Sequence, residues 1–221
     1  MSLNLPREAV IFDMDGLLID SEPLWQQAEL DIFHSLGKDP STRGLIPDTL
    51  GMRIDQVVKL WYQLSPWSGE TLEEVTQRII ARAVTLVDEQ RPLLPGVEQA
   101  LEIVRERGLK IGLASASPLF MLEKVLEMFG LRHFFNHIES AEHLPFSKPH
   151  QEVYLLAAAH LEVEADRCIT LEDSFNGMIA TKAARMRSIV VPDAAYRTDP
   201  RWAVADVKLN SLLELTAEHL R

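Results

Sequence analysis

Two aspartates separated by one residue directly follow a short apolar run near the start of the chain. The stretch AVIFDMDG places Asp13 and Asp15 after residues 9–12, with Gly16 next. A buried strand that ends in two like charges is unfavourable unless a cation balances them. Mg²⁺ takes oxygen ligands and is usually held by one or two carboxylates together with a substrate phosphate. The pattern therefore predicts a magnesium-assisted site, in which Gly16 lets the chain turn closely beneath a ligand.

Polar residues also follow three later apolar segments. Ser115 closes the run KIGLAS, Lys148 lies in the loop LPFSKPH, and Glu172 and Asp173 follow the run CITL. The carboxyl ends of parallel strands meet at one edge of an open sheet, where ligands bind. We therefore expect all of these groups to converge on the end of the first strand.

Each group also has an ordinary structural explanation. DMDG can form a turn and a helix N-cap, Ser115 can cap the next helix, and LEDS can cap the helix that follows it. Lys148 can be a solvated surface lysine. The combination favours chemistry, because three converging carboxylates beside a buried sheet need a divalent cation or an ammonium group. On this interpretation Asp13 and Asp173 hold a hard cation, and the backbone carbonyl of Asp15 completes its shell.

The elements that must position these residues alternate between strand and helix. Short β-branched runs occur at residues 9–12, 110–115, 137–140, 168–171, 188–191 and 206–209. Segments of helical period separate most of them, which predicts an α/β fold, a Rossmann-like parallel sheet with helices on both faces. Residues 20–91 instead contain three helical segments and no convincing strand. We therefore expect an α/β core of residues 1–19 and 92–221 and an inserted all-α cap of residues 20–91.

Composition limits the partners and the compartment. The chain has 221 residues, a formal net charge of −11 and no basic stripe, so binding of nucleic acid is disfavoured. No apolar run is long enough to cross a membrane, and MSLNLPRE lacks a secretory apolar segment. The one cysteine, Cys168, is expected to be a small buried side chain. These features predict a cytoplasmic protein, and nothing in them demands more than a monomer.

DMDG after a first strand, a serine at the end of the second, SKP downstream and LEDS before a helix resemble one known family. The family is the haloacid dehalogenase superfamily, in its Mg²⁺-dependent phosphatase branch with a small helical cap. The resemblance extends over essentially the whole chain. It implies hydrolysis of small sugar phosphates, such as hexose 6-phosphates, 2-deoxyglucose 6-phosphate or hexitol phosphates, through an aspartyl-phosphate intermediate.

The resemblance also implies a role for each motif residue. Asp13 would be the nucleophile, and Asp15 would protonate the leaving sugar oxygen and then deprotonate the hydrolytic water. Lys148 would neutralise charge on the phosphoryl group and on Asp13. The remaining residues would hold ligands, with phosphate oxygens bound by Ser115 and the backbone of Ala116, and Mg²⁺ bound by Asp173 with Glu172 nearby. A cis peptide before Pro149 is a further feature of the family.

Two other activities compete with hydrolysis. β-Phosphoglucomutase is similar in its motifs and cap but has a cap histidine where this sequence has Trp25. Since an indole cannot relay a proton, Trp25 favours hydrolysis, and it can wall a sugar pocket or simply pack between helices. A catalytically silent phosphate-binding module remains the other alternative.

Other features of the cap and core lead to three smaller expectations. Arg53, in the cap segment DTLGMRID, is expected to contact substrate, with an ion pair to Asp55 as the alternative. The cap is expected to hinge about residues 19–21 and 91–95. His133 and His137, four residues apart, are expected to have structural or surface roles, because RHFFNH leads into a strand without further ligands.

Overall fold

The computed structural model describes residues 6–39, 41, 45–46 and 49–221. Five of the N-terminal residues used to argue against a targeting segment lie outside these ranges, as do residues 40, 42–44 and 47–48 of the predicted cap. The strands are β1 (Ala9–Phe12), β2 (Lys110–Ser115), β3 (His137–Ser140), β4 (Cys168–Glu172), β5 (Arg187–Val190) and β6 (Val207–Lys208). The α-helices are α1 (Glu22–Ser35), α2 (Ile54–Leu64), α3 (Leu72–Gln90), α4 (Val97–Glu106), α5 (Leu119–Met128), α6 (Glu152–His160) and α7 (Phe175–Ala183).

The strands form one parallel sheet in the order β3-β2-β1-β4-β5-β6, which confirms the predicted α/β class. The chain builds outward from β1 to β2 and β3, then returns to the other side of β1 for β4, β5 and β6. The carboxyl end of β1 is therefore a topological switch point, where open α/β sheets bind their ligands. Phe12 pairs in register with Leu113 on one side and Leu171 on the other, so Asp13, Ser115 and Glu172 emerge close together.

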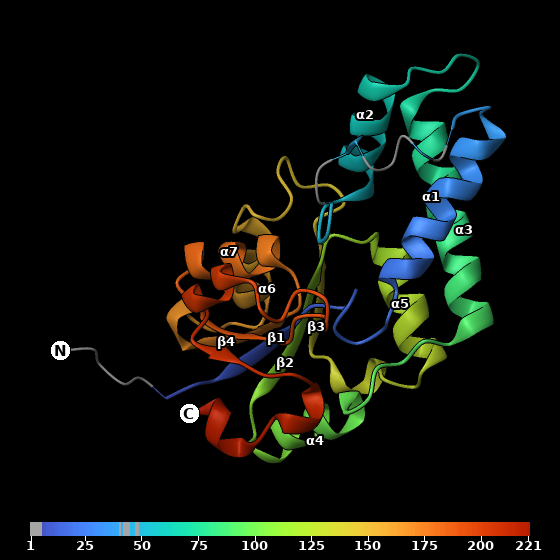
Figure 1. The fold of residues 1–221 in the computed structure, drawn as a ribbon. Helices are drawn as coiled ribbons and strands as arrows, with labels where there is room; N and C mark the ends of the chain where they lie inside the picture. Colours follow the sequence, from blue (N-terminus) through green and yellow to red (C-terminus); the bar gives the residue numbers. More distant parts are fainter. Residues whose placement is uncertain (1–5, 40, 42–44, 47–48) are drawn as a thin grey trace.

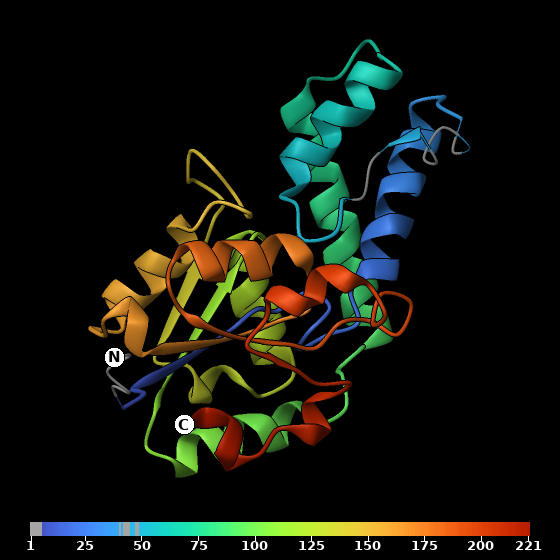
Figure 2. The same cartoon turned by 60° about the vertical axis from the view of Figure 1, so that its left-hand side comes forward.

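Alternate residues of β1 face two different layers. Val10 and Phe12 join a large apolar cluster with α4 and α5, whereas Ala9 and Ile11 pack with smaller residues of α6. Figures 1 and 2 show the two layers on opposite faces of the sheet. Cys168 lies in the second cluster, as expected, and burial raises the pKa of its thiol to about 12.

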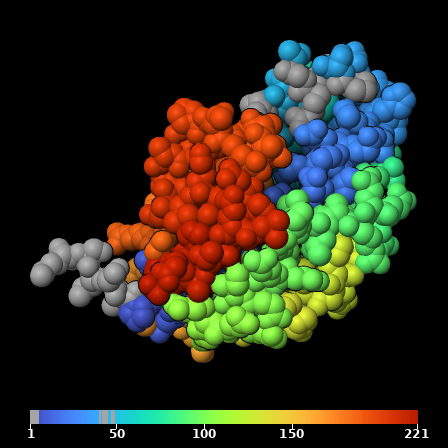
Figure 3. Space-filling model, turned by 60° about the horizontal axis from the view of Figure 1, so that its bottom comes forward, coloured from blue at the N-terminus to red at the C-terminus, as the bar shows by residue number. Residues whose placement is uncertain are grey.

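The C-terminal segment closes the base of the core. Its short 3-10 helices at Leu212–Glu214 and Ala217–Leu220 run beside α4, as Figure 3 shows by the red and green surfaces in contact. Leu212, Leu215 and Leu220 are buried in the large cluster. The end of the chain thus covers a helix face that would otherwise be exposed to water.

The three helices between β1 and α4 lie together beyond the carboxyl edge of the sheet (Figure 1). Phe33 of α1 stacks on Trp61 of α2 with ring centroids 4.2 Å apart, and both rings are buried. Helix α2 begins at Ile54 and does not extend back to Gly51, whose φ of 72° lies outside the right-handed α-helical region. No described helix is both long and apolar enough to span a bilayer.

Two chain crossings join these helices to the core and run side by side. Ile19 and Leu93 form an antiparallel bridge, and the Asp20 N–H donates to the Pro92 carbonyl at 2.8 Å. The Leu94 N–H donates to the Leu18 carbonyl at 2.9 Å. We propose that residues 20–91 form one cap unit and that these paired crossings are its hinge.

Candidate active site

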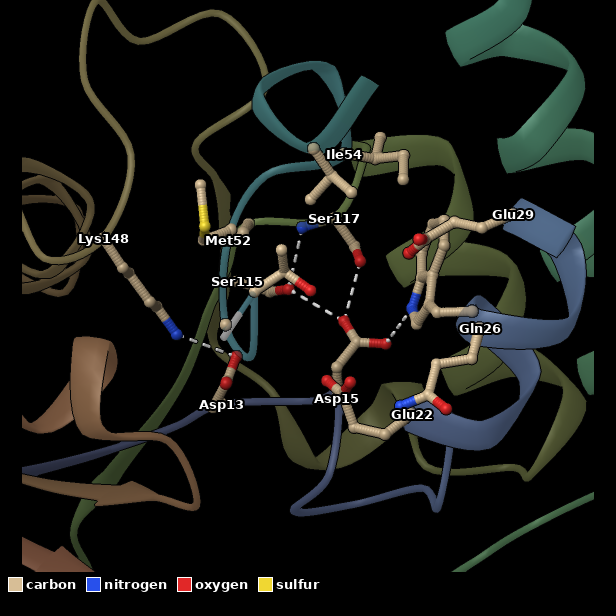
Figure 4. Close-up of a pocket in the computed structure, with 15 residues that line it drawn as sticks. Asp13, Asp15, Glu22, Gln26, Glu29, Met52, Ile54, Ser115, Ser117 and Lys148 are labelled. Carbon is tan, nitrogen blue, oxygen red and sulfur yellow. Dashed lines mark hydrogen bonds and ion pairs between the residues drawn. The ribbon is translucent and has the colours of Figure 1, made fainter. Parts of the chain in front are cut away.

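A buried lysine lies at the centre of the residues predicted from strand ends. Lys148 Nζ is 3.0 Å from Asp13 Oδ1, and it donates to Glu172 Oε1 at 2.6 Å and to the Ala114 carbonyl at 3.2 Å. Figure 4 shows the Lys148 ammonium pointing at Asp13. The side chain is only 1% exposed, so it is not the solvated lysine of the structural alternative. The Lys148–Pro149 peptide is cis, as the resemblance implied.

The charges of this cluster do not balance. Burial, together with the negative charges of Glu172 and Asp15, raises the pKa of Asp13 to about 8, although Lys148 opposes the shift. Burial and the same kind of repulsion raise the pKa of Asp173 well above its usual range. Burial alone would lower the pKa of Lys148, but Asp13 and Glu172 raise it. One ammonium is therefore too little positive charge for three ionised carboxylates.

The acids fit a hard divalent cation. Carboxylate oxygens of Asp13, Glu172 and Asp173 lie within 4.8 Å of one another and are all buried. Asp173 Oδ1 is buried and accepts no hydrogen bond from any described residue, so an oxygen ligand is left unsatisfied. Gly16 allows this approach, since a Cβ there would lie 2.1 Å from Asp173 Oδ2. An all-oxygen group of this kind suits Mg²⁺.

Glu172 differs from the other two acids because its oxygens are already occupied. Oε1 accepts from Lys148 and from the buried hydroxyl of Tyr154. Oε2 accepts from the Asp173 N–H, the Ser174 N–H and the Ser174 hydroxyl at 3.1 to 3.2 Å. We therefore propose that Asp13 and Asp173 bind the metal and that Glu172 holds Lys148 in place.

Asp15 lies among neutral donors instead of charges. Its Oδ1 accepts from the Ser21 hydroxyl at 2.7 Å and the Trp25 indole N–H at 2.9 Å. Its Oδ2 accepts from the Ser117 hydroxyl at 2.7 Å and, at a long 3.4 Å, from the Ser115 hydroxyl. Figure 4 shows the Asp15 carboxylate turned toward both serines and away from Lys148. The predicted contact between a metal ion and the backbone carbonyl of Asp15 stays a prediction.

Sequence reasoning missed Ser21, Ser117 and the donor role of Trp25. Ser21 occupies the N-cap position of α1 but makes no capping hydrogen bond, and its hydroxyl donates to Asp15. Ser115 does not cap α5 either, because its oxygen accepts the Ser117 N–H at 3.0 Å. In the sequence, a serine before a helix looks like an N-cap. That Ser21 instead hydrogen-bonds to Asp15 is seen only in the structure.

The LEDS motif both caps helix α7 and contributes to the cluster around Lys148. Ser174 caps α7 by accepting the Gly177 N–H at 3.0 Å, and its hydroxyl also donates to Glu172. Gly177 must be a glycine here, since a Cβ would lie 1.8 Å from Glu172 Oε1. The start of α7 is thus shaped around the acid that holds Lys148.

A small cavity separates the core from the cap helices. Asp13, Asp15, Ala116 and Lys148 line it from the core, and Trp25 is among the residues that line it from the cap. Its volume is about 50 Å³, which admits a few water molecules but no sugar phosphate. A sugar phosphate would therefore enter only if the cap helices moved away from the core, and the predicted hinge motion stays a prediction.

Arg53 is placed differently from the substrate contact expected for it. It is not among the described residues that line the cavity. Its guanidinium pairs with Asp55 at 2.6 Å, the alternative considered above, and donates to the Ala141 and Leu144 carbonyls at 2.7 Å. Since those carbonyls belong to the core, this arginine connects the cap to the core in the present arrangement. Contact with substrate stays a prediction.

Known proteins of similar sequence include several phosphatases. A family model described as haloacid dehalogenase-like hydrolase matches residues 10–191. Hexitol phosphatase B of Escherichia coli strain K12 is 62% identical over 220 residues, which cover 99% of each chain. The phosphorylated carbohydrates phosphatase of Thermotoga maritima is 31% identical over 182 residues, covering 82% of this chain and 83% of that protein.

Solved structures of similar fold include both a mutase and another family member. β-Phosphoglucomutase from Clostridium difficile superposes with a TM-score of 0.83 at 27% identity, covering 97% of this chain and 95% of that one. CbbY from Rhodobacter sphaeroides in complex with phosphate gives a TM-score of 0.84 at 28% identity, covering 97% and 99%. By its motifs, its sheet and these likenesses, this chain belongs to the haloacid dehalogenase-like hydrolases.

Proposed function

We propose that this chain is a Mg²⁺-dependent phosphatase that hydrolyses small sugar phosphates, such as hexose 6-phosphates, 2-deoxyglucose 6-phosphate or hexitol phosphates. The observation that carries the proposal is the pair of aspartates at the end of β1. Asp13 is buried against Lys148, and Asp15 faces the same cavity among neutral donors. The full-length likeness to hexitol phosphatase B supports the substrate class.

The reaction needs two half-reactions. In the first, a carboxylate oxygen of Asp13 attacks phosphorus, the bond from phosphorus to the sugar oxygen breaks, and Asp15 gives that oxygen a proton. In the second, water attacks the aspartyl-phosphate, its proton passes to Asp15, and Asp13 is released. Positioning and cationic stabilisation supply most of the catalysis in such transfers. Lys148 provides one cation at hydrogen-bonding distance from Asp13.

The hydrogen bonds of Asp15 indicate which of its oxygens carries the proton. Oδ1 accepts from the Trp25 N–H, which can only donate, so a proton on Oδ1 could be received by the Ser21 hydroxyl alone. Oδ2 faces only hydroxyls, and these can reverse to accept. We therefore assign the mobile proton to Oδ2, with the Ser117 hydroxyl as its nearest partner.

Bound Mg²⁺ would supply positive charge for the phosphoryl oxygens and for the ionised carboxylates of Asp13 and Asp173. Ser115 and the backbone of Ala116 line the cavity beside Asp13 and are proposed to hold the phosphoryl group. Tyr154 and Glu172 are proposed to fix Lys148, since both are fully buried around it.

Phosphoryl transfer between sugar positions is the second candidate, because the fold superposes on a β-phosphoglucomutase. Trp25 weighs against it, since the indole donates a fixed hydrogen bond to Asp15 and cannot exchange a proton with it. A mutase would also have to exclude water from the aspartyl-phosphate until the sugar rebinds. Hydrolysis is therefore preferred.

We further infer a monomeric enzyme of the cytoplasm. All side chains proposed for the site come from one chain, so no partner subunit is needed to complete it. The single cysteine is a buried thiol, which suits a reducing compartment. Size-exclusion chromatography with light scattering tests the monomer directly.

The test is phosphate release from a panel of hexose, hexitol and pentose phosphates, with and without Mg²⁺. The proposal expects Mg²⁺-dependent turnover that is highest for six-carbon sugar or hexitol phosphates and absent in Asp13→Asn. It also expects no conversion of β-glucose 1-phosphate to glucose 6-phosphate. Folded protein that releases no phosphate from any of these compounds would favour the binding-module alternative.

A further inference from the structure

Two histidines and a glutamate meet on the outer face of the sheet, away from the site described above. His137 and Glu139 are two residues apart on the edge strand β3, so their side chains lie on the same face of the sheet. His160 is the last residue of α6, the helix that packs on β3. Their ligand atoms all lie within 4.8 Å of one another.

Both imidazoles aim a nitrogen at the same carboxylate oxygen. His137 Nε2 is 2.9 Å and His160 Nδ1 is 2.8 Å from Glu139 Oε2, and the ring centroids are 4.4 Å apart. Two nitrogens and one oxygen thus converge from two separate elements. Small rotations of these side chains would place each atom at the roughly 2.0–2.2 Å that Zn²⁺ requires.

The surroundings of the cluster combine support with access. The Glu139 side chain is 15% exposed and the His137 side chain 28%, so the sheet limits their movement. The His160 side chain is 55% exposed, which leaves an open side for an ion and for a water ligand. Three protein ligands and one open position is an arrangement that tetrahedral Zn²⁺ adopts.

We propose that His137, Glu139 and His160 form a second metal site that takes a borderline transition-metal ion such as Zn²⁺. Imidazole with one carboxylate favours Zn²⁺, Co²⁺, Ni²⁺ or Cu²⁺, whereas the all-oxygen cluster around Asp13 favours Mg²⁺. The ion would fasten the edge strand β3 to the end of α6. His137 would then have more than the structural or surface role expected for it from its place at a strand without further ligands nearby in the sequence.

The test is Zn²⁺ binding to the full chain, freed of metal and then saturated with Mg²⁺, followed by calorimetry. We expect one Zn²⁺ per chain and a rise in the unfolding temperature. His160→Gln or His137→Gln should weaken Zn²⁺ affinity by about 100-fold or more, since losing an outer-shell partner already costs roughly 10- to 100-fold. Co²⁺ should give a visible absorption band that these variants lose.

His143→Gln is the matched control. His143 is an exposed histidine whose ring lies 3.9 Å from one carboxylate, that of Glu142, with no third ligand among the described residues. Its replacement should leave Zn²⁺ affinity unchanged. Mg²⁺-dependent turnover should stay the same in His160→Gln, which shows that the variant is folded. No Zn²⁺ binding in excess Mg²⁺, or equal binding by wild type and His160→Gln, would overturn the proposal.

Discussion

Asp13 and Asp15 are two residues apart, yet their surroundings are of opposite kinds. Asp13 lies among charges, with Lys148 at 3.0 Å and two further acids close by, all held by the core. Asp15 lies among neutral donors, and two of them, Ser21 and Trp25, belong to the start of the cap. In the mechanism proposed above, the core therefore positions the nucleophile, whereas the start of the cap completes the surroundings of the acid and base.

Asp13→Asn should have the largest effect. It changes only the charged half of the site, which is the cluster of Asp13, Lys148, Glu172 and Asp173. Without a nucleophile, turnover should fall by about 10⁴-fold or more. The amide keeps the shape of the carboxyl and cannot ionise, so the metal-free protein should not lose stability. Steady-state kinetics and urea unfolding check the two statements. Turnover within tenfold of wild type would show that Asp13 is not the nucleophile.

Lys148→Met should have the next largest effect. It leaves Asp13 and Glu172 buried without an ammonium, which should lower the free energy of unfolding by about 3 to 5 kcal/mol and abolish turnover. Lys59→Met removes an exposed ion pair to Asp55 and should cost less than about 1 kcal/mol. Urea unfolding of both variants measures the contrast. Equal costs would mean that the cluster around Asp13 is not a buried charge network.

Removal of Mg²⁺ should make stability fall with rising pH. In the metal-free protein the pKa of Asp13 is raised from 3.8 to about 8, so the folded state favours the protonated carboxyl. Between about pH 4 and pH 8 the folded chain then binds more protons than the unfolded chain, and the free energy of unfolding decreases as pH rises. Mg²⁺ requires the ionised carboxylates, so its stabilising effect should grow over the same window.

Thermal unfolding across this pH range, with and without Mg²⁺, measures the effect. Asp13→Asn serves as the control and should flatten the pH dependence of the metal-free protein. A Mg²⁺ effect on stability that is the same at about pH 5 and about pH 8 would contradict the charge imbalance.

Trp25→Phe should reduce turnover less. It changes the neutral half of the site, which is Asp15 with its uncharged hydrogen-bond donors. Phenylalanine keeps the ring but loses the N–H that fixes Asp15 Oδ1, so kcat should fall by about tenfold with little change in KM. Trp67→Phe loses a comparable indole bond, to the Glu70 carbonyl, and should leave kcat unchanged. Equal kcat in both variants and wild type would remove Trp25 from the mechanism.

Arg53→Ala should have the smallest effect. It deletes two hydrogen bonds from cap to core and should change KM by only a few-fold, equally for every sugar phosphate. Arg78→Ala, which breaks an ion pair with Glu70 inside the cap, is the control. A loss above about 100-fold that differs among sugars would instead support the substrate contact expected from the sequence.

The charged half of the site could be read from the sequence because each residue ends a strand. Asp13, Ser115 and Glu172 follow apolar runs, and parallel pairing brings such ends to one edge. Lys148 lies in the loop after a predicted strand, so the same rule placed it at this edge, and the family resemblance supplied its role beside Asp13. The same alternation predicted the strands to within one or two residues at their ends.

The neutral half could not be read in this way. Ser21 and Trp25 reach Asp15 only because the first turn of α1 lies against the end of β1, which local propensity does not specify. The metal ligands proposed on β3 and α6 come together for the same reason, since His137 and His160 are far apart in sequence. Contacts that depend on packing between elements require the structure.

The central claim is that Asp13 forms a bond to phosphorus, and trapping that bond tests it most directly. The enzyme is quenched in acid during turnover of a hexitol phosphate, reduced with borohydride, digested and sequenced by mass spectrometry. The account predicts homoserine at position 13, only when both substrate and Mg²⁺ were present. Homoserine at another position, or none at all from an enzyme in active turnover, would contradict it.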